Sequence, residues 1–248
     1  MARVDAAVPA VPADASPKRA ARLKGPARTQ AIVEAAAALF AEAGFSASTR
    51  ELAKRLGVTQ ALLYRFFPSK QALIDAVFEH VFQARLARRW DGLLDDRTQP
   101  LPARLKAFYL AYVNWTDPTG MRLFVRAGLD GMALTGVRGA TLTDQIFAPI
   151  IAELRRQAAL PTLDEAPLMR GERELCMALH GAVVFLAIRR HVYGLPTPDD
   201  VSAVVGLLVD TFVAGAPVSL SALHKDGPAS LRLTQLRPRP RSAKTPRE

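Results

Sequence analysis

A short stretch of the chain, residues 48–70, carries so many helix-start and helix-stop signals that few folds can accommodate it. Ser48, followed three places later by Glu51, forms a capping box that begins a helix. Gly57 can end this helix, because glycine accepts the left-handed conformation found just past many helix ends. Thr59 then caps a second helix. The stretch therefore predicts two short helices joined by a tight turn.

The second predicted helix has an apolar inner side and a more polar outer side, and Pro68 stops it. Its inner residues recur at helical spacing: Leu62, Leu63, Phe66 and Phe67. Its outward-pointing residues are Gln60, Ala61, Tyr64 and Arg65. This layout predicts a helix-turn-helix whose second helix enters the major groove of DNA.

At these residues the sequence resembles the tetracycline-repressor (TetR) family of one-component regulators. The turn 57–59, the tyrosine Tyr64 and the downstream lysine Lys70 occur together, and residues 35–45 form the lead-in helix. The resemblance implies an all-α fold, with an N-terminal three-helix helix-turn-helix DNA-binding domain and a C-terminal helical domain for ligand binding and dimerisation. It also implies a regulator whose DNA binding responds to a small molecule.

The expected DNA contacts lie on the outer side of this motif. Gln60 can form paired hydrogen bonds with adenine, and Arg65 can bind guanine or a phosphate. Tyr64 carries its hydroxyl on a rigid ring, which suits a phosphate at the edge of the groove. The resemblance implies backbone contacts from Thr49, Arg50, Thr59, Tyr64 and Lys70, and base contacts from 60–62 and Arg65. The full expected set is Ser48, Thr49, Arg50, Thr59, Gln60, Ala61, Leu62, Tyr64, Arg65 and Lys70.

The rest of the chain shows helical periodicity and neither a repeat nor an alternating strand pattern. We expect a disordered basic arm at 1–27, the DNA-binding domain at 28–75, an effector-binding and dimerisation domain at 76–214, and a disordered basic tail at 215–248. Removal of this tail is expected to leave the dimer intact. The expected helices outside the motif are 29–43, 70–90, 103–115, 121–129, 142–160, 172–192 and 198–214.

The composition favours a polyanionic partner in a reducing compartment. The net charge is +10, and the sequence pI is about 10.3. The single cysteine, Cys176, precludes an intrachain disulfide, which fits a cytoplasmic protein, and we expect it to be a small buried apolar residue. We find no apolar run of about 18 residues and no signal peptide, so no membrane partner is expected.

One recognition helix reads too few base pairs for a unique site. We therefore expect a homodimer on a near-palindromic, double-stranded operator. The dimer surface is expected from residues 172–192 and 198–214, whose small residues permit close helix approach: Ala178, Gly181, Ala182 and Gly206. The alternative is that these helices only complete the core of the monomer.

A small-molecule effector is expected in an apolar pocket with few polar groups, as ligand sites commonly are. The candidate lining residues are Tyr112, Trp115, Phe124, Phe147, Met177 and His180. Plain core packing is the alternative for each of them, and His180 on an apolar helix is typical of a satisfied core histidine. The resemblance implies that the ligand releases a repressor from its operator.

The sequence also bears on two other classes of protein. An enzyme is disfavoured because the sequence has no H-E-x-x-H, no C-x-x-C and no glycine-rich phosphate loop. We expect no catalytic residues, no metal site and no cofactor. A helical interaction protein that binds nucleic acid without sequence specificity is the alternative function. An activator or a ligand-independent repressor also remains open.

Overall fold

The structure, a computed structural model, describes residues 25–83, 92–132 and 142–226. All regular structure in these segments is helical, which confirms the predicted all-α fold. The helices are α2 (Pro26–Ala43), α3 (Thr49–Leu56), α4 (Gln60–Phe66), α5 (Lys70–Phe78), the π-helical turn η1 (Glu79–Gln83), α7 (Leu101–Trp115), α8 (Pro118–Leu129), the π-helical turn η2 (Thr143–Phe147), α10 (Ala148–Gln157), α11 (Arg170–His191) and α12 (Val201–Asp226). The expected arm at 1–27 lies almost wholly outside the described residues, as does the end of the expected 70–90 helix.

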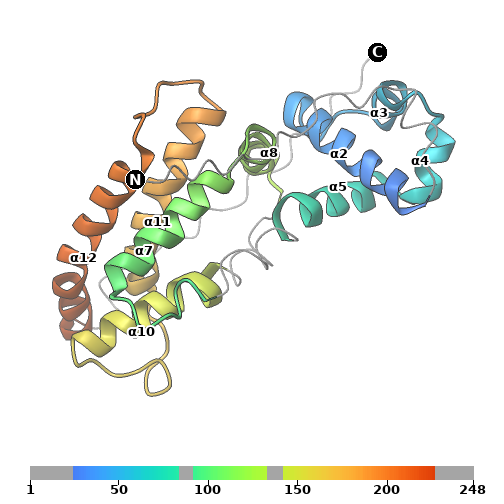
Figure 1. Ribbon diagram of the computed structural model, residues 1–248. Coiled ribbons are helices and arrows are strands. Elements are labelled where there is room, and N and C mark those ends of the chain that lie inside the picture. The colour runs from blue at the N-terminus through green and yellow to red at the C-terminus, as the bar shows by residue number, and fades with distance from the viewer. Residues whose placement is uncertain (1–24, 84–91, 133–141, 227–248) are drawn as a thin grey trace, which may run out of the picture.

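Figure 1 shows an elongated molecule with α2, α3, α4 and α5 at one end and α7, α10, α11 and α12 at the other. We call the first group the headpiece. Helix α8 lies between the two groups, and it packs against both α2 and α11. The headpiece therefore meets the rest of the protein through a helix that follows it by some forty residues in the sequence, as well as through the chain that leaves α5.

Side-chain caps begin the three short helices of the headpiece. The hydroxyl oxygens of Ser48, Thr59 and Ser69 each accept a hydrogen bond from the backbone N–H three residues later, at 3.0–3.2 Å. Each such cap contributes about 1 kcal/mol. Gly57 ends α3 with φ 64°, in the left-handed region where glycine is favoured. The predicted starts and the predicted turn are thus confirmed.

The headpiece closes around an apolar core that includes part of α8. We call it the first core; among its buried members are Leu39, Phe40, Leu52, Leu63, Leu73, Val77, Leu123 and Ala127. The last two residues come from α8 and are fully buried. The first core therefore extends beyond residues 28–75, and position 75 falls inside α5.

A second apolar core lies among α7, α10, α11 and α12. Its buried members include Leu105, Phe108, Tyr109, Ile150, Leu154, Leu179, Val183, Val205 and Val209. Cys176 belongs to it and is buried, as predicted. Burial raises the pKa of this thiol to about 12, so Cys176 is an apolar packing residue.

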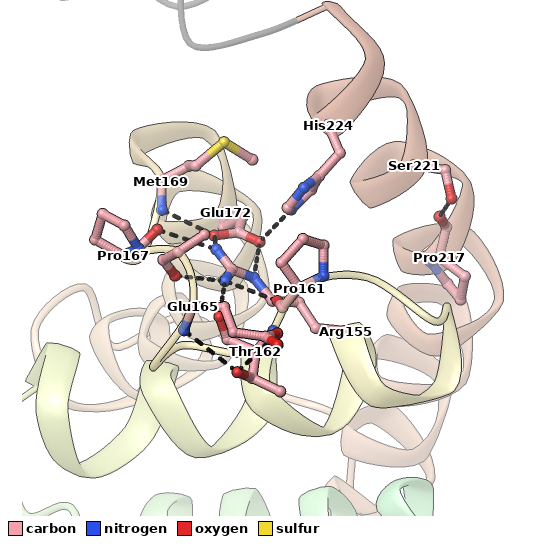
Figure 2. Close-up of polar contacts among 11 residues, drawn as sticks. Arg155, Pro161, Thr162, Glu165, Pro167, Met169, Glu172, Pro217, Ser221 and His224 are labelled. Carbon is pink, nitrogen blue, oxygen red and sulfur yellow. Dashed lines mark hydrogen bonds and ion pairs between the residues drawn. The ribbon is translucent and has the colours of Figure 1, made fainter.

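A fully buried ion pair joins α10 to α11 in the second core. Arg155 donates two hydrogen bonds to Glu172, from Nε at 2.7 Å and from Nη2 at 2.6 Å. Its other donors reach backbone carbonyls of the connecting loop, those of Pro161, Thr162, Ala166 and Pro167. Figure 2 shows this fan of contacts around one guanidinium. Arg155 therefore ties several carbonyls of the loop to α10, while three leucines of the same segment pack against the second core: Leu160, Leu163 and Leu168.

The last helix is longer than predicted. We expected it to end near residue 214, but α12 continues through Pro217 to Asp226. Proline lacks the N–H that a helix interior needs, yet Ala216 and Leu220 are buried in the second core and hold this turn in place. Ser221 donates to the carbonyl of Pro217 at 2.9 Å, and the imidazole of His224 lies 3.0 Å from Glu172 (Figure 2). Tertiary packing thus overrides a local helix-stop signal; residues 227–248 lie outside the described residues.

The expectation that no apolar run is long enough to cross a membrane was wrong. The segment Val201–Lys225 satisfies that test by length and composition, although one such helix is weak evidence of a membrane span. Only 22% of its most apolar window is buried. Helix α12 therefore presents an apolar face that the described chain leaves uncovered.

Candidate nucleic-acid interface

The recognition helix α4 is anchored on one side and free on the other. Leu63 points into the first core and is almost wholly buried. On the opposite side Ala61, Tyr64 and Arg65 are exposed, and Tyr64 retains 43% of its accessible surface. Leu62 is half-buried between the two sides. The outer side is thus a ridge of mixed chemistry on a rigid support, at the far end of the molecule in Figure 1.

The hydroxyl of Thr49 ties α4 to the first turn of α3. The amide nitrogen of Gln60 donates to Thr49 Oγ1 at 2.7 Å, and the hydroxyl oxygen of Tyr64 lies 3.3 Å from the same atom. Thr49 is only 9% exposed. The structure therefore places this residue beneath the surface, where it positions Gln60 and Tyr64, rather than at the surface itself. Gln60 keeps one N–H and its amide oxygen for a base edge.

Positive charges surround this ridge. Arg50 and Arg65 are exposed, Lys70 is half-buried at the first position of α5, and no ion pair holds any of the three within the described part of the chain. Arg55, by contrast, pairs with Glu42 at 2.8 Å and with Glu51 at 3.4 Å. The unpaired cations can therefore neutralise phosphates without first breaking an internal contact.

Two further expected residues lie at the starts of helices α3 and α4. Ser48 and Thr59 are both exposed, and their hydroxyls accept the cap hydrogen bonds of α3 and α4. A capping hydroxyl still has a proton to donate to a neighbouring acceptor. Thr49 is the one buried residue among the ten expected; three are half-buried, Gln60, Leu62 and Lys70, and the other six are exposed.

Helices α11 and α12 carry a second exposed feature, a set of large apolar side chains that we call the apolar stripe. On α11 it contains Phe185, which is 49% exposed; on α12 it contains Leu207 and Val218, which are 67% and 73% exposed. Between these large residues lie small ones. A Cβ built at Gly181 or Gly215 would meet no other atom, so a neighbouring helix could approach closely there.

The six expected effector residues separate into three groups. Four gather in the second core: Tyr112, Trp115, Phe147 and His180. The His180 ring lies 5.2 Å from that of Tyr112 and 5.9 Å from that of Phe147. Phe124 packs instead against the first core, and Met177 faces outward on the stripe of α11, so the structure does not bring these two to the aromatic cluster.

Two buried polar atoms in this cluster lack a hydrogen-bond partner among the described residues, Tyr109 Oη and His180 Nδ1. Burial lowers the pKa of His180 to about 4 and raises the pKa of Tyr109 well above its ordinary value. Both side chains are therefore neutral near pH 7. Tyr109 was not among the expected effector residues, although it lies one turn before Tyr112 on α7, and its ring lies 6.0 Å from that of His180. Within the described residues no group of three metal-binding side chains is present.

The comparisons with known proteins point to one family. Residues 32–77 match the model of "Bacterial regulatory proteins, tetR family". A nucleoid occlusion factor SlmA from Marinomonas sp. is 35% identical over 151 residues, which cover 60% of this chain and 72% of that protein. The HTH-type transcriptional repressor KstR2 of Mycobacterium tuberculosis is 35% identical over 81 residues, 32% of this chain and 40% of the relative.

A further sequence match is shorter, and two solved structures align over most of the chain. The SlmA protein of Marinobacter nauticus is 39% identical over 64 residues, and the chain spans only 33% of its length. Two solved structures share the fold. A putative transcriptional regulator from Pseudomonas aeruginosa PAO1 aligns with a TM-score of 0.60 at 18% identity, covering 84% of this chain and 97% of that one. A tetR-family transcriptional regulator from Streptomyces coelicolor aligns with a TM-score of 0.53 at 19% identity, covering 82% and 86%.

Proposed function

Because the chain belongs to the TetR family of bacterial regulatory proteins, we propose that it is a DNA-binding transcriptional regulator and not an enzyme. The observation that carries this proposal is the outer side of α4. It is exposed and is held by the first core behind it, and its neighbours Arg50, Arg65 and Lys70 form no ion pair with any described residue. Duplex DNA as the partner places the protein in the cytoplasm.

The division of labour on this surface follows from its chemistry. Gln60 and Arg65 read base edges, with Ala61 and Leu62 near enough to contact a thymine methyl group. Tyr64, Lys70 and Arg50 bind phosphates, together with the hydroxyls of Ser48 and Thr59, and they fix the orientation of the helix.

A homodimer supplies the second recognition helix. The apolar stripe of α11 and α12 is its interface. Phe185, Leu207 and Val218 are exposed there, whereas large apolar patches are rarely exposed on a monomer. A two-fold dimer places two α4 helices on half-sites about one helical turn, or about 34 Å, apart. The operator is therefore a near-palindrome.

The control is repression relieved by a small, largely apolar ligand. The aromatic cluster around His180 supports this, because two of its buried polar atoms have no hydrogen-bond partner among the described residues, and a ligand could satisfy them. The ligand must bind better to the form that does not fit the operator, since otherwise it shifts no equilibrium. The mycobacterial relative KstR2 is a transcriptional repressor, which favours repression over activation here.

The test is selection of bound duplexes from random DNA, followed by affinity measurements on the selected operator and on a scrambled duplex. Tyr64→Phe is expected to weaken both complexes similarly, whereas Gln60→Ala weakens the operator complex by about 1–3 kcal/mol and leaves the scrambled complex nearly unchanged. Equal losses on both duplexes for Gln60→Ala would show that this residue reads no base. If no sequence is enriched, and any duplex competes equally, the protein is instead a nonspecific nucleic-acid binder.

A further inference from the structure

Helix α8 carries two arginines one turn apart that cap the ends of two different helices. Arg122 donates from Nε to the carbonyl of His191, the last residue of α11, at 3.2 Å. Arg126 donates from Nε to the carbonyl of Ala41 at 3.0 Å and from Nη2 to that of Glu42 at 2.6 Å, in the last turn of α2. Helix α8 thus connects α11, which carries part of the apolar stripe, with α2, the first helix of the headpiece.

The chemistry of the α2 end explains why it needs an outside cap. The last carbonyls of a helix lack an internal partner and carry partial negative charge. Helix α2 has no basic residue in its last turn, so it cannot neutralise this end itself. The guanidinium of Arg126 supplies both hydrogen bonds and charge, and it does so from α8.

A second contact extends the hold into the turn before α3. Asp130, just after α8, accepts a hydrogen bond from the backbone N–H of Phe45 at 3.1 Å. Gly44 lies between the two contacts with φ 82°, and a Cβ built there would lie 3.4 Å from Arg126 Nη1 and 3.6 Å from Asp130 Oδ2. Two side chains therefore fix the backbone of residues 41–45 to α8.

From these contacts we infer that Arg126 and Asp130 are positioning residues that set the angle of the headpiece relative to α11, and so the separation of the two recognition helices in the dimer. The inference rests on the proposed function, because only a two-fold DNA binder has such a separation to set. The first core supports it, since Leu123 and Ala127 of the same helix are buried against the headpiece. A displacement of the α11 end can reach α2 through one turn of α8.

The test measures affinity for a series of operators in which one base pair is added or removed between the half-sites. Each such change shifts and rotates one half-site, so the wild-type protein should lose at least about tenfold in affinity. Arg126→Met removes the donors but keeps the length of the side chain, and Asp130→Ala removes the acceptor at an exposed position. For both variants, the affinity for the operators with altered spacing should fall less than about threefold below the affinity for the unaltered operator. Their affinity for a single half-site should stay within about twofold of wild type.

The controls separate positioning from stability. Arg156→Met makes the same chemical change at an exposed site on α10 and should keep the sharp dependence on spacing. Arg126→Lys keeps the charge and should restore part of the dependence of affinity on half-site spacing. Because each profile is a ratio of affinities, a lowered fraction of folded protein does not change its shape. The inference would be overturned if Arg126→Met and Asp130→Ala both fold and both keep the wild-type profile. If the affinity of the wild-type protein does not depend on spacing, the proposed dimer on paired half-sites is overturned instead.

Discussion

The wild-type protein should lose stability as the pH falls from about 7 to about 5, and replacement of His180 by leucine should remove most of this loss. Burial lowers the pKa of this imidazole from 6.5 to about 4, so the folded protein resists a proton that the unfolded chain accepts. The unfolded state therefore binds more protons between these two values, and stability falls as the pH decreases through 6.5. A difference of 2.5 pKa units corresponds to about 3 kcal/mol in full, of which about 2 kcal/mol is lost by about pH 5.

The assay is urea unfolding at several pH values in this window, at fixed protein concentration because a dimer is expected. The window stops at about pH 5 because carboxylates with lowered pKa values, such as Glu172, begin to contribute below it. His191→Gln is the matched control; the pKa of His191 is also lowered, first by burial, but its side chain is half-exposed, so the control should keep most of the loss. If the free energy of unfolding of His180→Leu falls as steeply with acid as that of wild type, the imidazole is not the buried neutral group described above.

Three further predictions concern the second core and the stripe. Arg155→Met leaves the carboxylate of Glu172 buried without its main partner, so the free energy of unfolding should fall by about 3–5 kcal/mol in denaturant titrations. Leu207→Glu places a charge in the apolar stripe of α12, and light scattering should then report a monomer that retains its helical circular dichroism. A chain ended after Gly215, which the sequence alone suggested would dimerise normally, should melt at a lower temperature because it lacks two buried residues of α12; a chain ended after Asp226 should match wild type, and equal melting of the two would contradict the packing seen here.

The headpiece could be predicted closely because its signals are local. The caps at Ser48, Thr59 and Ser69 and the turn at Gly57 depend on residues within four positions of each other. The end of α12 could not, because Pro217 reads as a stop while the packing that keeps it helical comes from helices distant in the sequence. The sequence of α8 has the pattern of an ordinary amphipathic helix. Its place between the two cores depends on contacts with α2 and α11, which a local pattern does not predict.

The candidate site divides in the same way. The outward side of α4 follows from helical spacing, and the structure exposes Ala61, Tyr64 and Arg65 as that spacing predicts. The position of Thr49 does not follow, because its hydroxyl is buried by side chains from another helix. Met177 was expected beside the other effector residues, but it is exposed; α11 is apolar on two sides, and periodicity alone does not tell which of them faces the core.

The two apolar sides of α11 have a functional consequence. One side places His180 in the aromatic cluster, and the other places Phe185 on the stripe proposed as the dimer interface. Its final carbonyl, that of His191, accepts a hydrogen bond from Arg122 of α8. Under the proposed function, a ligand that separates the rings around His180 can displace α7, η2 or α11, and we expect a displacement of α11 to be directed along its axis toward α8. If the stripe is the dimer interface, as proposed, the partner subunit opposes a sideways movement of α11, and an axial one ends at the carbonyls of α2 to which Arg126 donates.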